Sequence, residues 1–445
     1  MHLHPAAPRA SRRAWTVMLG LLVPLAVLTA VGLLALWPAG ASEADAGGWD
    51  PAAAIDGSSR AVGTVTMVDL RQCPEAETYG CSAVTVEVDG TEGSLFVPPE
   101  AFAAKLAPGD SVKVMSMPDD ASADPVAEAL TGDSGSEGSG AEVSDGLRTS
   151  APGDPASGNA TGAPAAADYV FLDFDRTVSL SVLATVYAAL VVLVAGLKGL
   201  RALIGLVFAF AVMVVFMLPA LLDGSSAVLV GTTAASVIMF AVLYLAHGFS
   251  ARTTSALLGT LLGIALTGIL AAVWTDWAKL GGIYSEEAYI LSWTDGLSTA
   301  DLVICGILIA GLGVLNDVTI TQAAAVWELA VARPGMRAAE LFASAMRIGR
   351  DHIASTVYTI AFAFAGGALT VLLLVSSSSR PFIESLTLGE LAIEVVSILV
   401  CSIGLVLAIP LTTLISVIVV RSGQAVSLTA DGGRAPLGGR TVGRH

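Results

Sequence analysis

Four carboxylates and two threonines lie in or beside hydrophobic stretches that are long enough to span a membrane. Two of the carboxylates belong to the stretch 311–330, GLGVLNDVTITQAAAVWELA. A charged side chain near the centre of a bilayer costs about 2.5 kcal/mol or more, so a carboxylate at that depth must be protonated, paired or hydrated. A desolvated carboxylate that takes up and releases a proton is what a proton-coupled carrier requires. The candidates for a proton or ion pathway are Asp317, Thr321, Glu328, Asp351, Thr359 and Glu394.

The helical repeat places these candidates on three polar faces. Gly306, Gly313, Asp317, Thr321 and Glu328 share one face of a helix with 3.6 residues per turn. Small residues permit close helix packing, and polar residues need partners that lipid does not offer, so we expect this face to look into the helix bundle. The matching faces of two later helices comprise Asp351, Ser355, Thr359, Gly366 and Thr370, and Glu394, Ser397, Cys401, Gly404, Ala408 and Thr412. Together the three faces could enclose a hydrated path.

Asp317 is the foremost candidate because of its depth. At a rise of about 1.5 Å per residue, it lies about 22 Å into a span that starts at Leu302. The alternative interpretation is a structural aspartate, hydrogen-bonded to Asn316 or Thr359, that never titrates. The other three carboxylates have their own alternative, which is that they mark helix interfaces.

The composition is that of an integral membrane protein. Of 445 residues, 54% are hydrophobic and 13% are charged, and the mean hydropathy is +0.76. The formal net charge of −16 comes mostly from acidic residues between Glu43 and Asp175. We find no basic and aromatic pattern for nucleic acid. Walker, zincin and Gly-x-Ser-x-Gly motifs are also missing from the sequence, and so is the GxGD motif of intramembrane aspartyl proteases. We therefore expect no enzyme chemistry, no cofactor and no metal.

Eight hydrophobic runs predict a mainly α membrane protein with eight transmembrane helices. The first run, 14–37, follows three arginines and is longer than a signal-peptide core, so we expect an anchor helix, although PAGASEA leaves cleavage open. The seven further runs are 177–197, 202–221, 226–247, 254–274, 301–330, 353–376 and 391–420.

The charges of the loops predict the orientation. The loops KGLR, HGFSAR and ARPGMRAAELFASAMRIGRDH are basic, whereas the loops between them are acidic or neutral. The positive-inside rule then places both termini, 1–13 and 422–445, in the cytoplasm and residues 38–176 outside. We expect this topology in a plasma (cell) membrane.

The external segment predicts a small extracytoplasmic antiparallel β domain at 56–118. Alternating apolar residues in GTVTMVDL, SAVTVEV, GSLFVPP and DSVKVMSM indicate four or more short strands. Residues 119–167 have the composition of a disordered linker, and 168–421 form the seven-helix core. Cys73 and Cys81 flank a loop of the external segment, where either a disulfide or two free thiols is open.

Three segments carry a resemblance to a known family. The stretch 311–330, ELFASAMRIGRDHIASTVYTIAFAFAGGALTVLLL and CSIGLVLAIPLTTLIS resemble the core of the YibE/F-like family of bacterial multi-pass membrane proteins. KGLRALIGL, HGFSARTTSALLGTLLG and YVFLDFDR fit the same family. This resemblance implies topology and bacterial origin but no substrate. The order of elements also resembles, more weakly, the SecD/SecF subunits and RND-type membrane cores, in which a membrane-embedded Asp belongs to the proton pathway.

These observations leave two functions open. The first is a transporter or proton-coupled envelope machine that uses its membrane-embedded carboxylates. The second is a non-transporting scaffold or sensor that binds an envelope component through its β domain. The expected partners are the lipid bilayer and either a second copy of the chain or a sister membrane subunit.

Overall fold

The computed structural model describes residues 11–38, 59–69, 81–116, 168–282, 298–377 and 381–431, together with Tyr289. The chain divides into two compact units. The barrel unit is Ser42–Tyr187, and the membrane unit comprises Met1–Ala41 and Ala188–His445. The predicted linker 119–167 and the residue Cys73 lie outside the described residues, so the expected disulfide remains a prediction.

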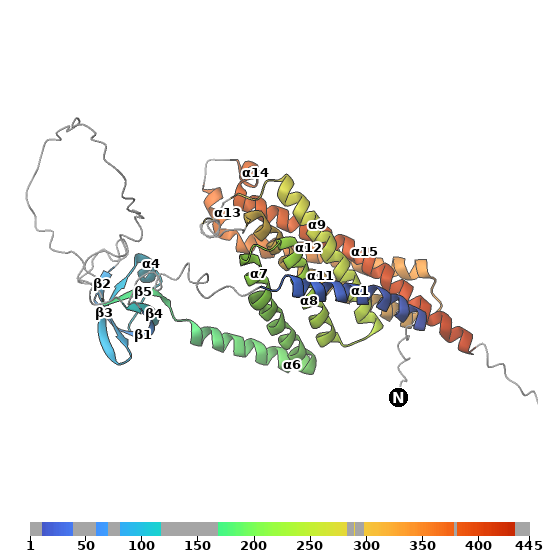
Figure 1. Ribbon diagram of the computed structural model, residues 1–445, viewed down its shortest axis with the longest axis horizontal. Helices are drawn as coiled ribbons and strands as arrows, with labels where there is room; N and C mark the ends of the chain where they lie inside the picture. Colours follow the sequence, from blue (N-terminus) through green and yellow to red (C-terminus); the bar gives the residue numbers. More distant parts are fainter. Residues whose placement is uncertain are drawn as a thin grey trace, which may run out of the picture. The chain divides into compact units, whose positions relative to one another are not determined.

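The barrel unit contains a closed barrel of five strands in the order β1-β2-β3-β5-β4 (Figure 1). Its core is made by the inward residues of each strand, among them Val65, Val86, Leu95 and Val114, as the alternating pattern predicts. Asp89 and Gly90 both have positive φ and form the tight turn between two strands. The elements are β1 (Ser59–Val68), β2 (Cys81–Val88), β3 (Thr91–Val97), α4 (Pro99–Ala103), β4 (Ser111–Ser116) and β5 (Tyr169–Phe174).

Strand β5 corrects the domain boundary that the sequence predicts. Tyr169–Phe174 was assigned to the membrane core, but it closes the barrel by pairing with both β3 and β4. The β3–β5 pair is parallel, so the sheet is not purely antiparallel. An edge strand leaves a row of backbone hydrogen-bonding groups unpaired, and β5 pairs with two such edges at once.

The junction between β5 and the following helix is held by short-range polar contacts. The Arg176 guanidinium donates to both Asp173 oxygens at 2.8 Å, and the Thr177 amide donates to Asp175 at 3.2 Å. The hydrogen bonds from Arg176 hold the pKa of Asp173 below its usual value, and those from Thr177 do the same for the pKa of Asp175.

The lowered pKa gives a pH-dependent stability for this junction. Because the folded pKa of Asp173 is depressed, its contribution is present above the unfolded pKa of about 3.9 and is lost as pH falls through the folded value. Asp173→Asn should therefore speed hydrogen exchange of the β5 amides at pH 7, corresponding to less than about 1 kcal/mol for this exposed pair. At about pH 3 the difference from wild type should shrink. Asp89→Asn is the control, and an equal effect of both variants at pH 7 would contradict the assignment.

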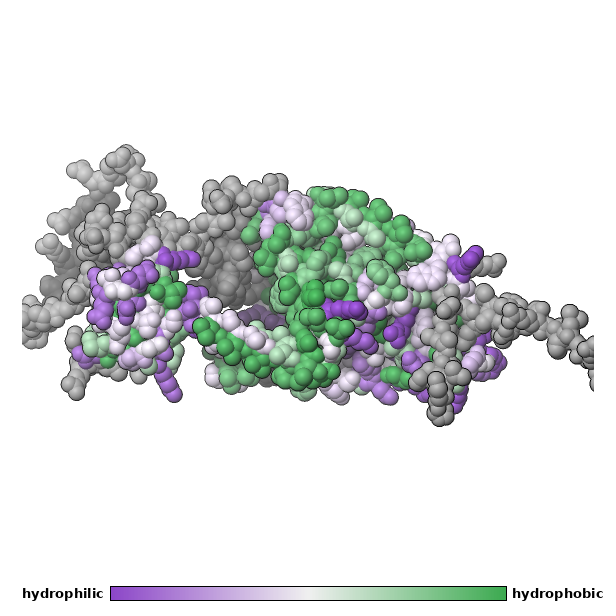
Figure 2. All heavy atoms as spheres, turned by 90° about the horizontal axis from the view of Figure 1, so that it is seen from below, coloured by the Kyte–Doolittle hydropathy of each residue, from purple (hydrophilic) through white to green (hydrophobic). Residues whose placement is uncertain are grey.

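The membrane unit is helical and contains the predicted runs. Much of its visible surface is hydrophobic, as expected of a surface that faces lipid (Figure 2). Its longer elements are α1 (Arg12–Ala35), α6 (Thr177–Val212, which begins in the barrel unit), η1 (Met213–Met217), α7 (Leu218–Leu222), α8 (Ala227–His247), α9 (Ala251–Trp277), α11 (Thr299–Ala332), α12 (Ala338–Gly367), α13 (Leu369–Ser376) and α15 (Gly389–Asp431). A short helix, α14 (Phe382–Ser385), precedes α15.

Six of the described helices are long and apolar enough to cross a membrane, or up to seven if the bent pair α12–α13 is one span. That pair bends by 70°. One of the six candidates, Thr177–Leu222, is interrupted at Gly196, whose φ of 60° and ψ of −140° are not helical. Such a conformation is open almost only to glycine, so it separates two helical segments where the sequence predicts two spans.

Helices α9, α11 and α15 pack together at the centre of the membrane unit. Small residues allow the close approach: a Cβ added at Gly259 of α9 would overlap Thr412 of α15, and one at Gly404 would overlap Thr267. Hydroxyl groups also form hydrogen bonds between these helices. The hydroxyl oxygens of Thr260 in α9 and Thr319 in α11 lie 2.6 Å apart.

Helix α12 begins inside the basic segment that the sequence predicts to be a loop. It starts at Ala338, and its buried residues Leu341, Ala345 and Gly349 recur at helical spacing. Arg347 and Arg350 are exposed. The basic segment therefore forms most of the amphipathic first half of α12. The apolar residues that follow it continue the same helix.

Candidate functional site

Asp317 lies near the middle of α11 and pairs with a histidine of α12. It is about 27 Å along the helix from Thr299 and about 22 Å from the other end at Ala332. The Asp317 Oδ2 atom is 3.9 Å from His352 Nε2. The Asp317 side chain is 73% exposed and the His352 side chain is 30% exposed. A carboxylate and an imidazole at this separation can exchange a proton directly after a small approach, or through one water molecule.

The polar face of α11 looks away from the bundle, and this corrects the prediction that it looks inward. Gly306, Gly313, Asp317, Thr321 and Glu328 do share one face, as the helical repeat indicates, and all five are exposed. A Cβ added at Gly306 or Gly313 would meet nothing within 4 Å. The opposite face of α11 makes the contacts with α9 and α15.

The reason lies in the second polar face of α11, which carries Thr319 and Gln322. The Gln322 amide donates to the backbone oxygen of Ala345 at 3.0 Å and to the Thr413 hydroxyl at 2.7 Å. The apolar and small residues of α11 are spread almost evenly around its circumference. The hydrophobic periodicity alone therefore does not tell which of its two polar faces is buried. The buried hydrogen bonds of Gln322 and Thr319 identify the inner one.

Of the other two predicted faces, the one on α12 is exposed and the one on α15 is buried. On α12, Asp351, Ser355 and Thr359 are exposed like the face of α11. On α15, Ser397, Cys401, Gly404, Ala408 and Thr412 are buried and Glu394 is half-buried. The three faces therefore do not enclose one hydrated path, which corrects the sequence-based expectation. Instead the structure brings the faces of α11 and α12 side by side through Asp317 and His352.

The remaining candidates occupy separate positions. The Thr321 hydroxyl donates to the backbone oxygen of Asp317 at 2.7 Å, and that of Thr359 donates to Ser355 at 3.2 Å. Neither threonine hydroxyl therefore binds the Asp317 carboxylate in this conformation. Glu328 is about 16 Å farther along α11, toward its C-terminal end.

His352 is the residue that sequence reasoning missed. The chain has only five histidines, and among them His352 lies well inside a helical segment with a carboxylate-bearing neighbour helix. A histidine at membrane depth is a functional candidate for the same reason as an aspartate. His352 Nε2 and Asn316 Oδ1 are both buried atoms without a hydrogen-bond partner among the described residues. Within the described part of the chain, two polar atoms near Asp317 therefore form no hydrogen bond.

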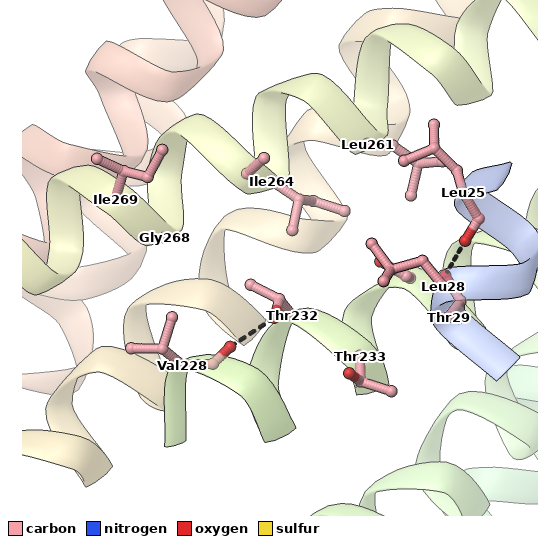
Figure 3. A pocket seen from close by; sticks show the side chains of 12 residues that line it. Leu25, Leu28, Thr29, Val228, Thr232, Thr233, Leu261, Ile264, Gly268 and Ile269 are labelled. Carbon is pink, nitrogen blue, oxygen red and sulfur yellow. Dashed lines mark hydrogen bonds between the residues drawn. The ribbon is translucent and has the colours of Figure 1, made fainter. Parts of the chain in front are cut away.

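A pocket elsewhere in the membrane unit contains none of the predicted residues. It has a volume of about 320 Å³ and lies between α1, α8 and α9 (Figure 3). Its walls are apolar apart from hydroxyls, and those of Thr29 and Thr232 donate to backbone oxygens one turn earlier in their own helices. The pocket therefore lacks a charged group that could orient a polar ligand. The lining includes Leu25, Leu28, Thr233, Leu261, Ile264 and Ile269.

Among the described residues, no group of three or more His, Cys, Asp or Glu side chains is placed to hold a metal ion. Cys305 and Cys401 are buried, and their thiols donate to the backbone oxygens of Ala227 and Ile307. Both act as packing residues between helices.

Comparison with known proteins assigns a family. A family model described as "YibE/F-like protein" matches residues 183–422, more than half of the chain. The matched region contains α8, α9, α11, α12 and the spanning part of α15, and so includes Asp317 and His352. No curated protein and no solved structure matches the chain. The weaker resemblance to the SecD/SecF subunits has no support from these comparisons.

Proposed function

Because this chain belongs to the YibE/F-like family and has a carboxylate–imidazole pair in the middle of its membrane unit, we propose that it is a proton-coupled transporter or envelope machine. The observation that carries the proposal is the 3.9 Å approach of Asp317 to His352. Both groups change charge by taking up or losing a proton, and they sit on adjacent helices that are in contact. Proton transfer between them would therefore be coupled to the packing of α11 against α12.

The proposal includes a topology with eight crossings in a bacterial cell membrane. It counts α1, the two segments of α6 that Gly196 separates, α8, α9, α11, the bent pair α12–α13, and α15. The loop charges then put both termini in the cytoplasm and the barrel outside. With this orientation α11 runs from the outer to the inner side, and the Asp317–His352 pair lies between the two surfaces.

Asp317→Asn tests the proposal. The purified chain is reconstituted in proteoliposomes, a pH gradient is imposed, and its decay is followed with a pH-sensitive dye. Wild type should dissipate the gradient, whereas Asp317→Asn should slow the decay about a hundredfold, because the amide cannot carry a proton. Asp301→Asn, in the first turn of the same helix, is the matched control and should behave like wild type.

A second measurement is needed because a coupled carrier can show no proton flux when its substrate is absent from the proteoliposomes. Growth or envelope integrity of cells that depend on the chain is compared for the same three proteins, after insertion is verified. Loss of function with Asp317→Asn alone supports the proposal. If the gradient decays equally with wild type and Asp317→Asn, and cells tolerate the substitution, the proposal is wrong.

One observation favours the alternative of a non-transporting scaffold or sensor. A closed five-stranded barrel with a helix between its third and fourth strands resembles the OB-fold barrels, which bind oligosaccharides and oligonucleotides on their exposed strands. Outside the cell such a barrel would bind an envelope component. Under this alternative, removal of residues 56–174 abolishes function while Asp317→Asn leaves it intact.

A further inference from the structure

The exposed polar surface of α11 and α12 has no cover among the described residues. We call it the carboxylate face. It carries acidic, basic, hydroxyl and glycine residues on two packed helices, which the Asp317–His352 pair joins. Its members are Gly306, Gly313, Asp317, Thr321, Glu328, Arg347, Arg350, Asp351, Ser355 and Thr359.

This surface does not suit contact with lipid. Asp317 is 73% exposed about midway along a spanning helix. Lipid tails offer no polar partners, and the described helices give the Asp317 carboxylate only the 3.9 Å approach of His352. A charge at this depth that is not fully compensated is costly. The N-terminal helix α1 packs on α8, α9 and α15 instead. The described part of the membrane unit therefore leaves this surface uncovered.

The charges on the face match a second copy of the same face. Along α11 they are acidic, at Asp317 and Glu328, whereas on α12 the face carries Arg347 and Arg350 against Asp351 and is basic on balance. Among the described residues, Glu328, Arg347 and Arg350 make no ion pair, and Arg347 donates to the Ser344 hydroxyl only. A two-fold axis beside α11 brings the two α11 helices together and also sets each acidic α11 next to the more basic α12 side of the face in the other copy, so the face is complementary to itself.

We propose that two copies of this chain associate through the carboxylate face, and that the proton site at Asp317 and His352 is complete only between them. This rests on the proposed function for the role of the pair, but the association itself does not. Gly306 and Gly313 let the two α11 helices approach closely, because nothing of their own chain fills the space in front of them. The second copy then supplies the polar surroundings that the 3.9 Å pair lacks.

Cysteine cross-linking in native membranes tests the association. All four cysteines of the full chain are first replaced by alanine, and a single cysteine is introduced at Gly313 or at Thr321. A short thiol cross-linker should then give at least about fivefold more covalent dimer than in the controls. The controls, Leu262→Cys on α9 and Leu407→Cys on α15, are exposed positions near the middle of other helices.

A bulky substitution in the proposed interface is the second test. Gly313→Trp, added to the Thr321→Cys chain, should lower the yield of dimer at least about tenfold, because an indole prevents close approach. Leu262→Trp should leave the yield unchanged. Equal cross-linking at Gly313 and Leu262, or no effect of Gly313→Trp, would overturn the proposed interface.

The outcomes separate this inference from the proposed function. Dimers through Gly313 in a chain whose Asp317→Asn variant still dissipates the gradient would keep the interface and remove the proton role. A proton flux that depends on Asp317, with cross-linking no higher at Gly313 than at Leu262, would keep the proton role and remove the interface.

Discussion

Replacement of His352 by glutamine is expected to slow proton-driven flux about ten- to hundredfold. Glutamine has a similar reach and still forms hydrogen bonds, so α11 and α12 should remain packed. It cannot take up a proton, however, and the 3.9 Å pair with Asp317 would then lose its only other titrating member. The measurement is the rate of gradient decay in proteoliposomes.

A double-mutant cycle shows whether the two residues act as one site. If protons pass between them, adding His352→Gln to Asp317→Asn should slow the flux no further than Asp317→Asn alone, because groups that work as a unit are not additive. His247→Gln is the control, since His247 ends α8, a helix that carries neither member of the pair. Additive losses in the double variant, or an equal loss with His247→Gln, would exclude a shared site.

Substitution of Gly259 by alanine is expected to destabilise the membrane unit by about 1–3 kcal/mol, the range of an overpacked core. The added Cβ would overlap the Thr412 side chain where α9 and α15 are in closest contact. Gly313→Ala is the matched control on α11. Its Cβ would meet nothing within 4 Å, and alanine favours the helix, so its effect should be small. Thermal unfolding in detergent and the amount of folded protein in membranes measure the difference.

The source of the Gly259 effect can be verified by a second substitution. Thr412→Ala removes the hydroxyl that lies nearest to the new Cβ, so combining it with Gly259→Ala should restore part of the lost stability. An equal loss from Gly313→Ala, or no recovery in the combined variant, would show that close approach of α9 and α15 is not the cause. If Gly313→Ala instead lowered only the yield of covalent dimer, the carboxylate face would be the sensitive surface.

Several features of this protein could be read from the sequence alone. Hydrophobic length located α1, α8, α9, α11 and the apolar part of α15, because a bilayer imposes a minimum span on any sequence that crosses it. The 3.6-residue repeat grouped Gly313, Asp317 and Glu328 on one face correctly. Quoted motifs such as 311–330 indicated the YibE/F-like family, which the family match confirms. These are local properties, determined by residues close together in the chain.

Only the tertiary structure decided which surfaces meet. Strand β5 joins β3 and β4 across a long intervening segment, and a pairing at that sequence distance leaves no trace in local alternation. The sequence likewise does not distinguish the two polar faces of α11, since lipid and helix neighbours are both apolar. The contacts of Gln322 with α12 and α15 bury one face. They thereby turn Asp317 outward beside His352, a partner that becomes apparent only when two helices are placed together.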